Sequence, residues 1–324
     1  MTEVAPALMP VRAVPSGQGG DFVLRPIAGP ADFLFGLHGR PPAGDPAAAG
    51  LQTLPIRAFQ PGRPALPPLL SIWHLTRCGS TLTARMLACL QALQVTDEPG
   101  ALVDICGAFW SLVPDAERLA ALDKTLLALG QPLHHAARHL VVKQSLRAGL
   151  EPDLFTRLHP GMQRLLLIRD PLEILVSNLR GKPGWLHLRH MAWSPLLSGL
   201  ALDRQSRLSD AEFIAHCLGR AFSILADRVA QNPAGWLILD YAELPDAIIT
   251  RLLPRLGITP GPDELAAMAE VTKLQAWNRA GRLPFSDDRA EKQAAASPEI
   301  RALCDQFLRP PWHRLAALHA GQLG

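Results

Sequence analysis

The change of hydrophobic period at Gly79 constrains this chain more than any other feature. Residues 69–73 are mostly apolar, which is typical of a short buried parallel strand. Beyond the glycine, apolar residues recur at helical spacing instead. A strand that turns sharply into a helix aims free backbone N–H groups at one point, which favours anion binding. Arg77, Ser80 and Thr81 add guanidinium and hydroxyl donors, so the sequence predicts a phosphate-binding loop.

The loop differs from that of the nucleoside triphosphatases, which read G-x-x-x-x-G-K-[ST]. It has neither the first glycine nor the lysine. Its sequence Arg-Cys-Gly-Ser-Thr-Leu resembles instead the loop with which sulfotransferases bind a 5′-phosphosulfate group. On the loop alone, a purely structural strand–turn–helix is the alternative. The resemblance assigns nucleotide binding to all six residues: Arg77, Cys78, Gly79, Ser80, Thr81 and Leu82.

A second strand–helix junction is predicted over residues 164–179. Asp170 and Glu173 have the spacing of a capping box at the start of its helix. In the sulfotransferase family an arginine at this strand end and a serine eight residues later hold the 3′-phosphate of the nucleotide. Arg169 and Ser177 match these two positions, and arginine binds phosphate in bidentate fashion. The alternative is that Arg169 only pairs with Asp170 or another neighbour.

Further positions match the family in chain order. Glu98 stands where tyrosylprotein-type sulfotransferases carry a catalytic glutamate, and Lys143 closes an apolar strand where the same subfamily has a lysine. Tyr241, in Leu-Ile-Leu-Asp-Tyr-Ala-Glu-Leu, resembles a segment whose tyrosine lies against the nucleotide. Residues 285–292, which end in Lys292, resemble the late loop that closes over the nucleotide.

The chain thus resembles the sulfotransferases that use 3′-phosphoadenosine 5′-phosphosulfate (PAPS), and it is closer to their tyrosylprotein or bacterial type than to the cytosolic small-molecule type. The resemblance implies an α/β fold, a P-loop-type three-layer sandwich with a central parallel sheet flanked by helices. It implies in-line transfer of a sulfuryl group from PAPS to an acceptor hydroxyl or amine, without a metal ion. The expected catalytic residues are Glu98 as general base, with Lys143 and Arg77 stabilising the leaving phosphate.

Two positions depart from the family pattern. Ser145 replaces the histidine that the cytosolic small-molecule enzymes use, which is why Glu98 is the expected base. Gly181 replaces an additional basic residue of the 3′-phosphate site. Two other functions therefore stay open. One is a P-loop phosphotransferase, a kinase using a nucleoside triphosphate and magnesium, and the other is a nucleotide-binding protein without catalysis.

The composition excludes several other classes. The 324 residues carry a net charge of +3 without any Lys/Arg run, so nucleic acid is not an expected partner. No stretch approaches the ~18 consecutive apolar residues of a membrane span, and the first residues lack a signal-peptide pattern, so we expect a cytoplasmic protein. The 5 cysteines form no Cys-x-x-Cys pair and indicate free thiols. No thiol or carboxylate accompanies the histidine clusters at ligand spacing, so no metal site is expected.

The expected organisation has three parts. Residues 1–20 are predicted to be disordered, residues 21–68 to be a Pro- and Gly-rich extension packing on the domain, and residues 69–324 to form the sulfotransferase domain. Apolar runs at 21–26 and 31–37 predict edge strands or a clamp on the main sheet. Alternating strands and helices after residue 69 predict a parallel sheet covered on both faces. The expected strands are near 69–75, 139–143, 164–168 and 235–239; the expected helices are near 81–93, 115–130, 171–180, 209–231, 244–256 and 297–320.

The sequence does not specify the acceptor. Residues 181–210 are rich in Trp, His and Arg, which predicts part of an acceptor pocket. Aromatic walls suit an apolar or aromatic acceptor, although packing explains such residues equally well. A small metabolite, peptide, lipid or sugar therefore stays open as the acceptor, and so does the oligomeric state. The candidate pocket residues are Trp110, Phe109, Trp185, His187, His190 and Trp193.

Overall fold

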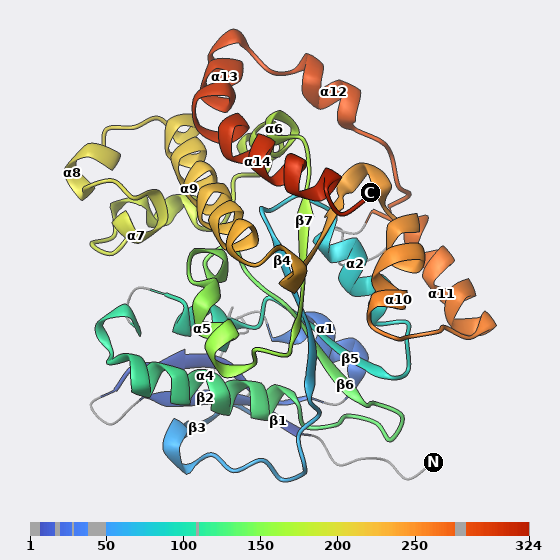
Figure 1. The fold of residues 1–324 in the computed structure, drawn as a ribbon. Coiled ribbons are helices and arrows are strands. Elements are labelled where there is room, and N and C mark those ends of the chain that lie inside the picture. The colour runs from blue at the N-terminus through green and yellow to red at the C-terminus, as the bar shows by residue number, and fades with distance from the viewer. Residues whose placement is uncertain are drawn as a thin grey trace. The chain divides into compact units, whose positions relative to one another are not determined.

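The computed structural model describes residues 7–16, 20–27, 29–37, 50–107, 110–275 and 283–323. The strands of this part of the chain form two sheets, with the orders β1-β2-β3 and β5-β6-β4-β7-β8 (Figure 1). The strands are β1 (Ala7–Val14), β2 (Asp21–Ile27), β3 (Gln52–Pro55), β4 (Pro68–His74), β5 (Leu93–Asp97), β6 (His139–Lys143), β7 (Gln163–Ile168) and β8 (Trp236–Asp240).

The five-stranded sheet confirms the predicted α/β class. Within it β4 pairs with β6, β5 with β6 and β7 with β8, all in parallel. The four strands predicted from the sequence, β4, β6, β7 and β8, lie within about one residue of their expected bounds. β5 was not predicted, because apolar residues recur at helical spacing up to Leu93 and the expected helix near 81–93 therefore ran into it, whereas α2 ends at Leu87. All five side chains of β5 are buried.

Helices connect and flank the strands. They are α1 (Pro30–Gly36), α2 (Ser80–Leu87), α3 (Gly100–Ile105), α4 (Asp115–Leu129), α5 (Pro152–Leu158), α6 (Pro171–Gly181), α7 (Pro195–Ser198), α8 (Leu202–Gln205), α9 (Asp210–Gln231), α10 (Leu253–Arg255), α11 (Pro262–Thr272), α12 (Arg289–Ala294), α13 (Pro298–Leu303) and α14 (Arg309–Ala320). The predicted starts of α4, α6 and α9 are confirmed within one residue.

Local sequence explains where α6 begins. The Asp170 carboxylate accepts hydrogen bonds from the backbone N–H groups of Leu172 and Glu173, at 2.9 and 3.1 Å. Pro171 occupies the first helical position, where its missing N–H costs nothing. The helix therefore starts directly after Arg169, the last residue before the cap, and this places Arg169 at the carboxyl end of β7.

Two predicted long helices are interrupted by π-helical turns. Residues Ile248–Leu252 (η7) precede α10, and residues Cys304–Leu308 (η8) separate α13 from α14. In each case a proline follows the π turn by two residues, Pro254 after η7 and Pro310 after η8. Proline has no N–H to donate to the carbonyl four residues earlier, so the α-helical hydrogen bond is missing there. This favours the hydrogen bonds between residues five apart that define a π turn.

The chain divides into two compact units. Unit 1 comprises Met1–Ile72, Thr81–Met162 and Thr259–Val271, and unit 2 comprises Trp73–Ser80, Gln163–Ile258 and Thr272–Gly324. This division does not follow the predicted boundary at residue 69. The N-terminal extension shares unit 1 with α2, β5 and β6, whereas the loop after β4 belongs to unit 2.

Unit 1 contains the antiparallel sheet β1-β2-β3, against which α3 and α4 pack through β1. Figure 1 shows α4 beside this sheet. The predicted disorder of residues 1–20 is wrong for 7–14, which form β1, because Met9 and Ala13 are buried there and β2 supplies backbone partners. The run at 31–37 forms the helix α1 rather than a strand, since Pro30 suits a first helical turn.

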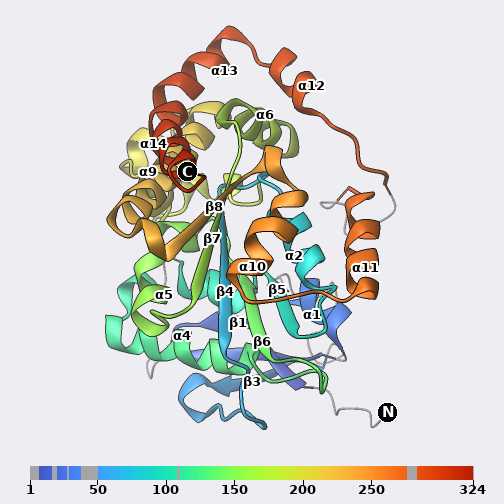
Figure 2. The same ribbon diagram turned by 45° about the vertical axis from the view of Figure 1, so that its right-hand side comes forward.

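Unit 2 contains β7 and β8 with the helices α6, α9 and α14. Figures 1 and 2 show α9 beside α14, and the two helices are in contact. Their buried faces include Phe213 and Phe222 from α9 and Leu315 from α14. In the described part of both units, no helix combines the length and the apolar character that crossing a membrane requires.

Candidate nucleotide and catalytic site

The loop between β4 and α2 has an unusual backbone. Thr76, Arg77 and Gly79 all have positive φ angles, of 59°, 53° and 82°. Such conformations cost non-glycine residues on the order of 1–3 kcal/mol and persist only where the surroundings hold them. Two contacts hold Thr76 in this conformation. The side-chain amide of Asn178 in α6 donates to the Thr76 hydroxyl at 2.8 Å, and His74 Nδ1 accepts a hydrogen bond from the Thr76 N–H at 3.1 Å. Successive turns of this kind form a concave anion-binding nest of N–H groups.

Gly79 is required at its position for two reasons. Its φ of 82° lies in the left-handed region that favours glycine. A Cβ atom added there would lie 2.5 Å from Leu244 Cδ1 and 3.0 Å from Tyr241 Cδ2. The ring of Tyr241 therefore lies directly against the loop.

Cys78 fills space inside the loop. Its side chain is fully buried, and its Sγ donates to the carbonyl of Thr76 at 2.9 Å. Burial raises the pKa of the Cys78 thiol to about 12, so the thiolate that nucleophilic chemistry needs is scarce at neutral pH. Cys78 therefore contributes packing to the loop and no nucleophile.

Arg169 joins several of the predicted site residues. Its Nη1 donates to the carbonyl of Arg77 in the loop at 3.1 Å. Its guanidinium carbon lies 3.9 Å from the centre of the Tyr241 ring, in a cation–π contact. Its Nε donates to Glu173 at 2.7 Å, so Arg169 does pair with a neighbour, although with Glu173 rather than Asp170. Arg169, only 4 % exposed, thus links the loop, β7, α6 and the end of β8.

The loop over residues 285–292 also reaches Arg169. Asp288 accepts a hydrogen bond from Arg169 Nη2 at 3.2 Å and forms an ion pair with Lys292 Nζ at 2.6 Å. Burial lowers the pKa of Lys292, although Asp288 acts in the opposite direction. Burial alone would raise the pKa of Asp288, but Lys292 and Arg169 outweigh it, so the pKa of Asp288 is lowered. We call Arg77, Gly79, Arg169, Tyr241, Asp288 and Lys292 the Arg169 cluster.

Two other predicted positions lie near this cluster without joining it by hydrogen bonds. Ser177 is half-buried on α6, and its hydroxyl has no partner among the described residues. Gly181 ends the same helix, and a Cβ atom added there would lie 2.5 Å from Arg77 Nη2. The Arg77 guanidinium thus lies beside Gly181, at the position where the family has an additional basic residue.

Unit 1 holds a second group of predicted residues around Lys143. Lys143 ends β6, and the parallel register pairs it with Asp97 at the end of β5. Lys143 Nζ lies 2.6 Å from Asp97 Oδ1, 2.8 Å from Glu98 Oε1 and 3.5 Å from Thr81 Oγ1. We call these four residues the Lys143 cluster. It brings the predicted base Glu98 and the predicted cation Lys143 into direct contact.

The electrostatics of this cluster keep Lys143 charged. Burial lowers the pKa of Lys143, but the charges of Glu98 and Asp97 and their hydrogen bonds act against it, and the net shift is upward. Asp97 is 2 % exposed, whereas the side chain of Glu98 is 30 % exposed. Glu98 also has a positive φ of 46°, a strained conformation that is often found at functional positions. Glu98 is thus the accessible carboxylate of the pair.

The remaining predicted loop residues lie where the loop enters α2. Ser80 is buried, and Thr81 and Leu82 are half-buried in the first turn of the helix. Ser145, which replaces the family histidine, accepts the N–H of Ala148 at 3.4 Å and so caps a turn. Among the described residues this cap is the hydrogen bond that the Ser145 hydroxyl forms, which indicates a structural role.

Two residues of these clusters, Asp97 and Asp288, and the loop partner Asn178 were not predicted as site residues. Asp97 precedes Glu98 at a strand end, and that position at the carboxyl edge of a parallel sheet was the available signal. Asp288 lies within the predicted loop 285–292, but its partners come from elsewhere in the chain. Asn178 follows Ser177, and nothing in the sequence indicates its bond to Thr76.

The candidate acceptor residues differ in how far they are buried and in what they contact. Trp110 is fully buried and donates to the carbonyl of Ala13 at 2.9 Å, so the acceptor-wall prediction is wrong for it, because it belongs to the core of unit 1. Trp185 packs against Phe213 at a centroid distance of 6.2 Å. His187 and His190 are exposed, Trp193 is half-buried, and Phe109 lies outside the described residues. Among the described residues no group of three His, Cys, Asp or Glu side chains could hold a metal ion.

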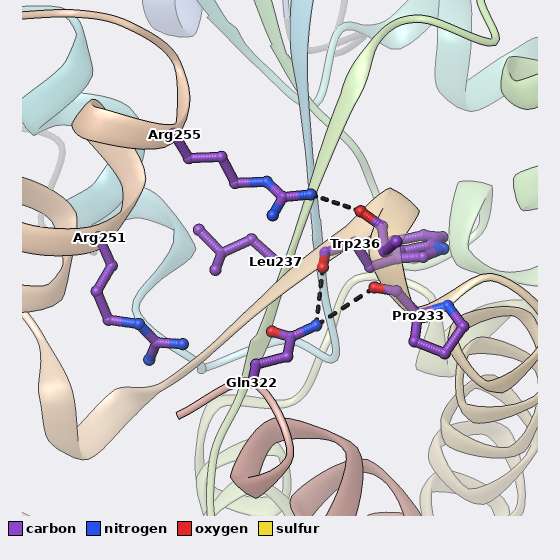
Figure 3. A pocket seen from close by; sticks show the side chains of 7 residues that line it. Pro233, Trp236, Leu237, Arg251, Arg255 and Gln322 are labelled. Atoms are coloured by element: carbon purple, nitrogen blue, oxygen red, sulfur yellow. Dashed lines mark hydrogen bonds between the residues drawn. The ribbon is translucent and has the colours of Figure 1, made fainter. Parts of the chain in front are cut away.

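A pocket of about 460 Å³ lies at the other end of β8. Figure 3 shows Arg251, Arg255 and Gln322 pointing into it beside Trp236 and Leu237. Its polar groups mostly bind the protein itself: Arg255 donates to the carbonyl of Ala234 at 2.7 Å, and Gln322 donates to that of Trp236 at 2.8 Å. The pocket opens at the amino end of the strand, whereas sheets of this kind bind ligands at the carboxyl ends.

Several solved structures of bacterial sulfotransferases resemble this chain. Sulfotransferase STF1 from Mycobacterium tuberculosis is 13% identical with a TM-score of 0.47, and the match covers 75% of this chain and 77% of that one. The sulfotransferase domain of the Synechococcus olefin synthase is 13% identical with a TM-score of 0.43, and the match covers 77% of this chain and 97% of that domain. A sulfotransferase from Alicyclobacillus acidocaldarius is 12% identical with a TM-score of 0.39, and the match covers 78% of this chain and 96% of that one. No family model and no curated protein matches the sequence.

Proposed function

We propose that this protein is a sulfotransferase that takes its sulfuryl group from PAPS. The observation that carries the proposal is the position of Arg169, which donates to the carbonyl of Arg77 and stacks on Tyr241. These three residues were assigned to one nucleotide from separate sequence motifs. A chance match of the motifs would give no reason for the Arg169 guanidinium to contact both the Arg77 carbonyl and the Tyr241 ring.

The loop supplies the proposed site for the 5′-phosphosulfate. Its positive φ angles at Thr76, Arg77 and Gly79 suit an N–H nest, and the exposed Arg77 adds a guanidinium fork. Ser80 and Thr81 add hydroxyl donors at the start of α2. An anion held by these groups needs no covalent chemistry from the protein, which suits a transfer driven by positioning and charge stabilisation.

The reaction we propose is an in-line displacement at sulfur. The acceptor oxygen or nitrogen forms a bond to sulfur as the bond between sulfur and the bridging phosphate oxygen breaks. The acceptor proton passes to Glu98, and 3′-phosphoadenosine 5′-phosphate leaves with the bonding electron pair. By analogy with phosphoryl transfer the transition state is loose, with negative charge growing on the leaving oxygen. A positioned base contributes roughly 10²–10⁴-fold.

Lys143 has a proposed role that depends on its three partners. As Glu98 takes the acceptor proton, it loses its negative charge and its attraction for Lys143 Nζ falls. The ammonium then becomes available toward Thr81, whose hydroxyl lies 3.5 Å away at the start of α2. Asp97 is buried, and its Oδ1 lies 2.6 Å from Lys143 Nζ, so it keeps Lys143 protonated and in place. Asp97 is therefore a positioning residue that acts through Lys143.

The proposal is tested by ligand-dependent thermal unfolding of the intact protein. The ligands are 3′-phosphoadenosine 5′-phosphate, AMP, and ATP with magnesium, each at equal concentration. A ligand at 100 times its Kd stabilises the native state by about 2.7 kcal/mol. We expect the largest rise in Tm from the 3′-phosphorylated nucleotide. A rise with ATP and magnesium alone would contradict the proposal and favour a phosphotransferase.

A further inference from the structure

Asp288 bridges two cations, Arg169 and Lys292, that the sequence resemblance assigns to the nucleotide. Its Oδ1 accepts from Arg169 Nη2 at 3.2 Å, and its Oδ2 lies 2.6 Å from Lys292 Nζ. One carboxylate thus spans two cationic groups with its two oxygens. A phosphate group likewise carries negative charge on more than one oxygen, and arginine and lysine are its usual partners in proteins.

The two cations are buried and the carboxylate is not. Arg169 and Lys292 are 4 % and 5 % exposed, whereas the Asp288 side chain is 41 % exposed. Arg169 has a second carboxylate, Glu173, whose side chain is only 8 % exposed and which accepts from Nε at 2.7 Å. Glu173 therefore serves as the permanent counter-ion of Arg169. Asp288 is the partner that can move into solvent at small cost.

The neighbouring Asp287 provides a contrast within the same loop. It pairs with Arg289, and both side chains are about half exposed. Pairing with an exposed partner contributes little, because solvent screens it. Only Asp288 of these two aspartates reaches the buried cations of the Arg169 cluster.

We propose that Asp288 is an internal competitor of the nucleotide 3′-phosphate, which must displace its carboxylate from Arg169 and Lys292 before binding fully. This inference rests on the proposed function, since it takes the ligand from there. The competition lowers affinity for donor and product alike, because both carry the 3′-phosphate. Faster release of the 3′-phosphorylated product is the benefit, and product release often limits turnover.

The size of the effect follows from the population of the displaced state. An apparent Kd equals the intrinsic Kd divided by the fraction of binding-competent protein. If the bridge is formed in about nine molecules of ten, its removal tightens binding about tenfold. A nucleotide without a 3′-phosphate does not need the two cations, so its Kd stays unchanged.

The test compares Asp288→Asn with Asp287→Asn as the matched control. Isothermal calorimetry measures the Kd of 3′-phosphoadenosine 5′-phosphate and of AMP for the wild type and both variants. We expect Asp288→Asn to tighten the 3′-phosphorylated nucleotide about tenfold, with AMP unchanged, and Asp287→Asn to change neither. An Asp288→Ser variant, which keeps a residue suited to the start of α12, serves if the asparagine variant folds poorly.

Each other outcome is informative in a different way. Weaker binding of the 3′-phosphorylated nucleotide by Asp288→Asn, or an unchanged Kd, would overturn the inference, because Asp288 would then support the cations rather than compete for them. Equal gains with AMP would also overturn it. Failure of the wild type to bind 3′-phosphoadenosine 5′-phosphate at all would instead contradict the proposed function.

Discussion

The buried pair of Lys143 and Asp97 makes a quantitative prediction about stability. Lys143→Met keeps most of the side-chain volume but removes the ammonium. Asp97, at 2 % exposed, then loses the cation that lies 2.6 Å from its Oδ1. Removing one partner of a buried ion pair costs about 3–5 kcal/mol, mainly because the other charge is left uncompensated. We expect Lys143→Met to lower the free energy of unfolding by this amount.

A double variant separates the lost charge from the lost packing. In Lys143→Met combined with Asp97→Asn, no buried charge is left without its partner. Replacing both members of a buried pair is often near neutral, so the double variant should recover at least about 2 kcal/mol of the loss. Residues in direct contact show coupling energies of about 0.5–3 kcal/mol in such cycles.

The assay is urea unfolding at pH 7, followed by circular dichroism. Arg157→Met is the matched control, because Arg157 forms an ion pair of similar length with Asp115, at 2.9 Å, but the side chains are 51% and 65% exposed. Exposed pairs contribute about 0–1 kcal/mol. If Lys143→Met cost no more than Arg157→Met, or if the double variant were as unstable as the single one, the reasoning about the buried pair would be refuted.

Three further predictions concern the loop, pH and catalysis. Gly79→Ala should lower the free energy of unfolding by about 2–4 kcal/mol, because the left-handed φ and the contact with Leu244 are both unfavourable to a Cβ atom. In thermal unfolding, a variant with the same Tm as the wild type would contradict this. Because the pKa of Lys143 is raised in the folded protein, this group contributes stability that is fully present below its ordinary pKa of 10.5 and is lost as the pH rises through its folded-state pKa. Lys143→Met should lack this alkaline loss of stability in pH-dependent unfolding. An identical loss in the variant would exclude Lys143 as its source. Glu98→Gln should reduce sulfuryl transfer by about 10²-fold or more while the Kd of 3′-phosphoadenosine 5′-phosphate stays within about twofold; retained turnover would exclude Glu98 as the base.

Local signals in the sequence predicted the elements that carry the candidate site. The switch of period at Gly79 predicted the end of β4 and the start of α2, and the Asp170 cap predicted the start of α6. Both signals act within a few residues, so they need no knowledge of the rest of the fold. The strands predicted from apolar runs were confirmed for the same reason.

Features that depend on distant partners could not be predicted in this way. β1 is a strand because β2 pairs with it and α3 and α4 cover it, although its own segment follows a Pro-containing start. Lys143 was predicted to stabilise the leaving phosphate, and its partners Asp97 and Glu98 could not be predicted because they depend on the register of β5 and β6. Asp288 reaches Arg169 across more than a hundred residues of sequence.

A crystal structure of the protein with 3′-phosphoadenosine 5′-phosphate would test the central claim most directly. The account predicts the 3′-phosphate on Arg169 and Lys292 in place of the Asp288 carboxylate, and the 5′-phosphate on the loop that contains Arg77 and Gly79. A nucleotide bound elsewhere, for example in the pocket of Arg251 and Arg255, with the bridge of Asp288 intact, would contradict it.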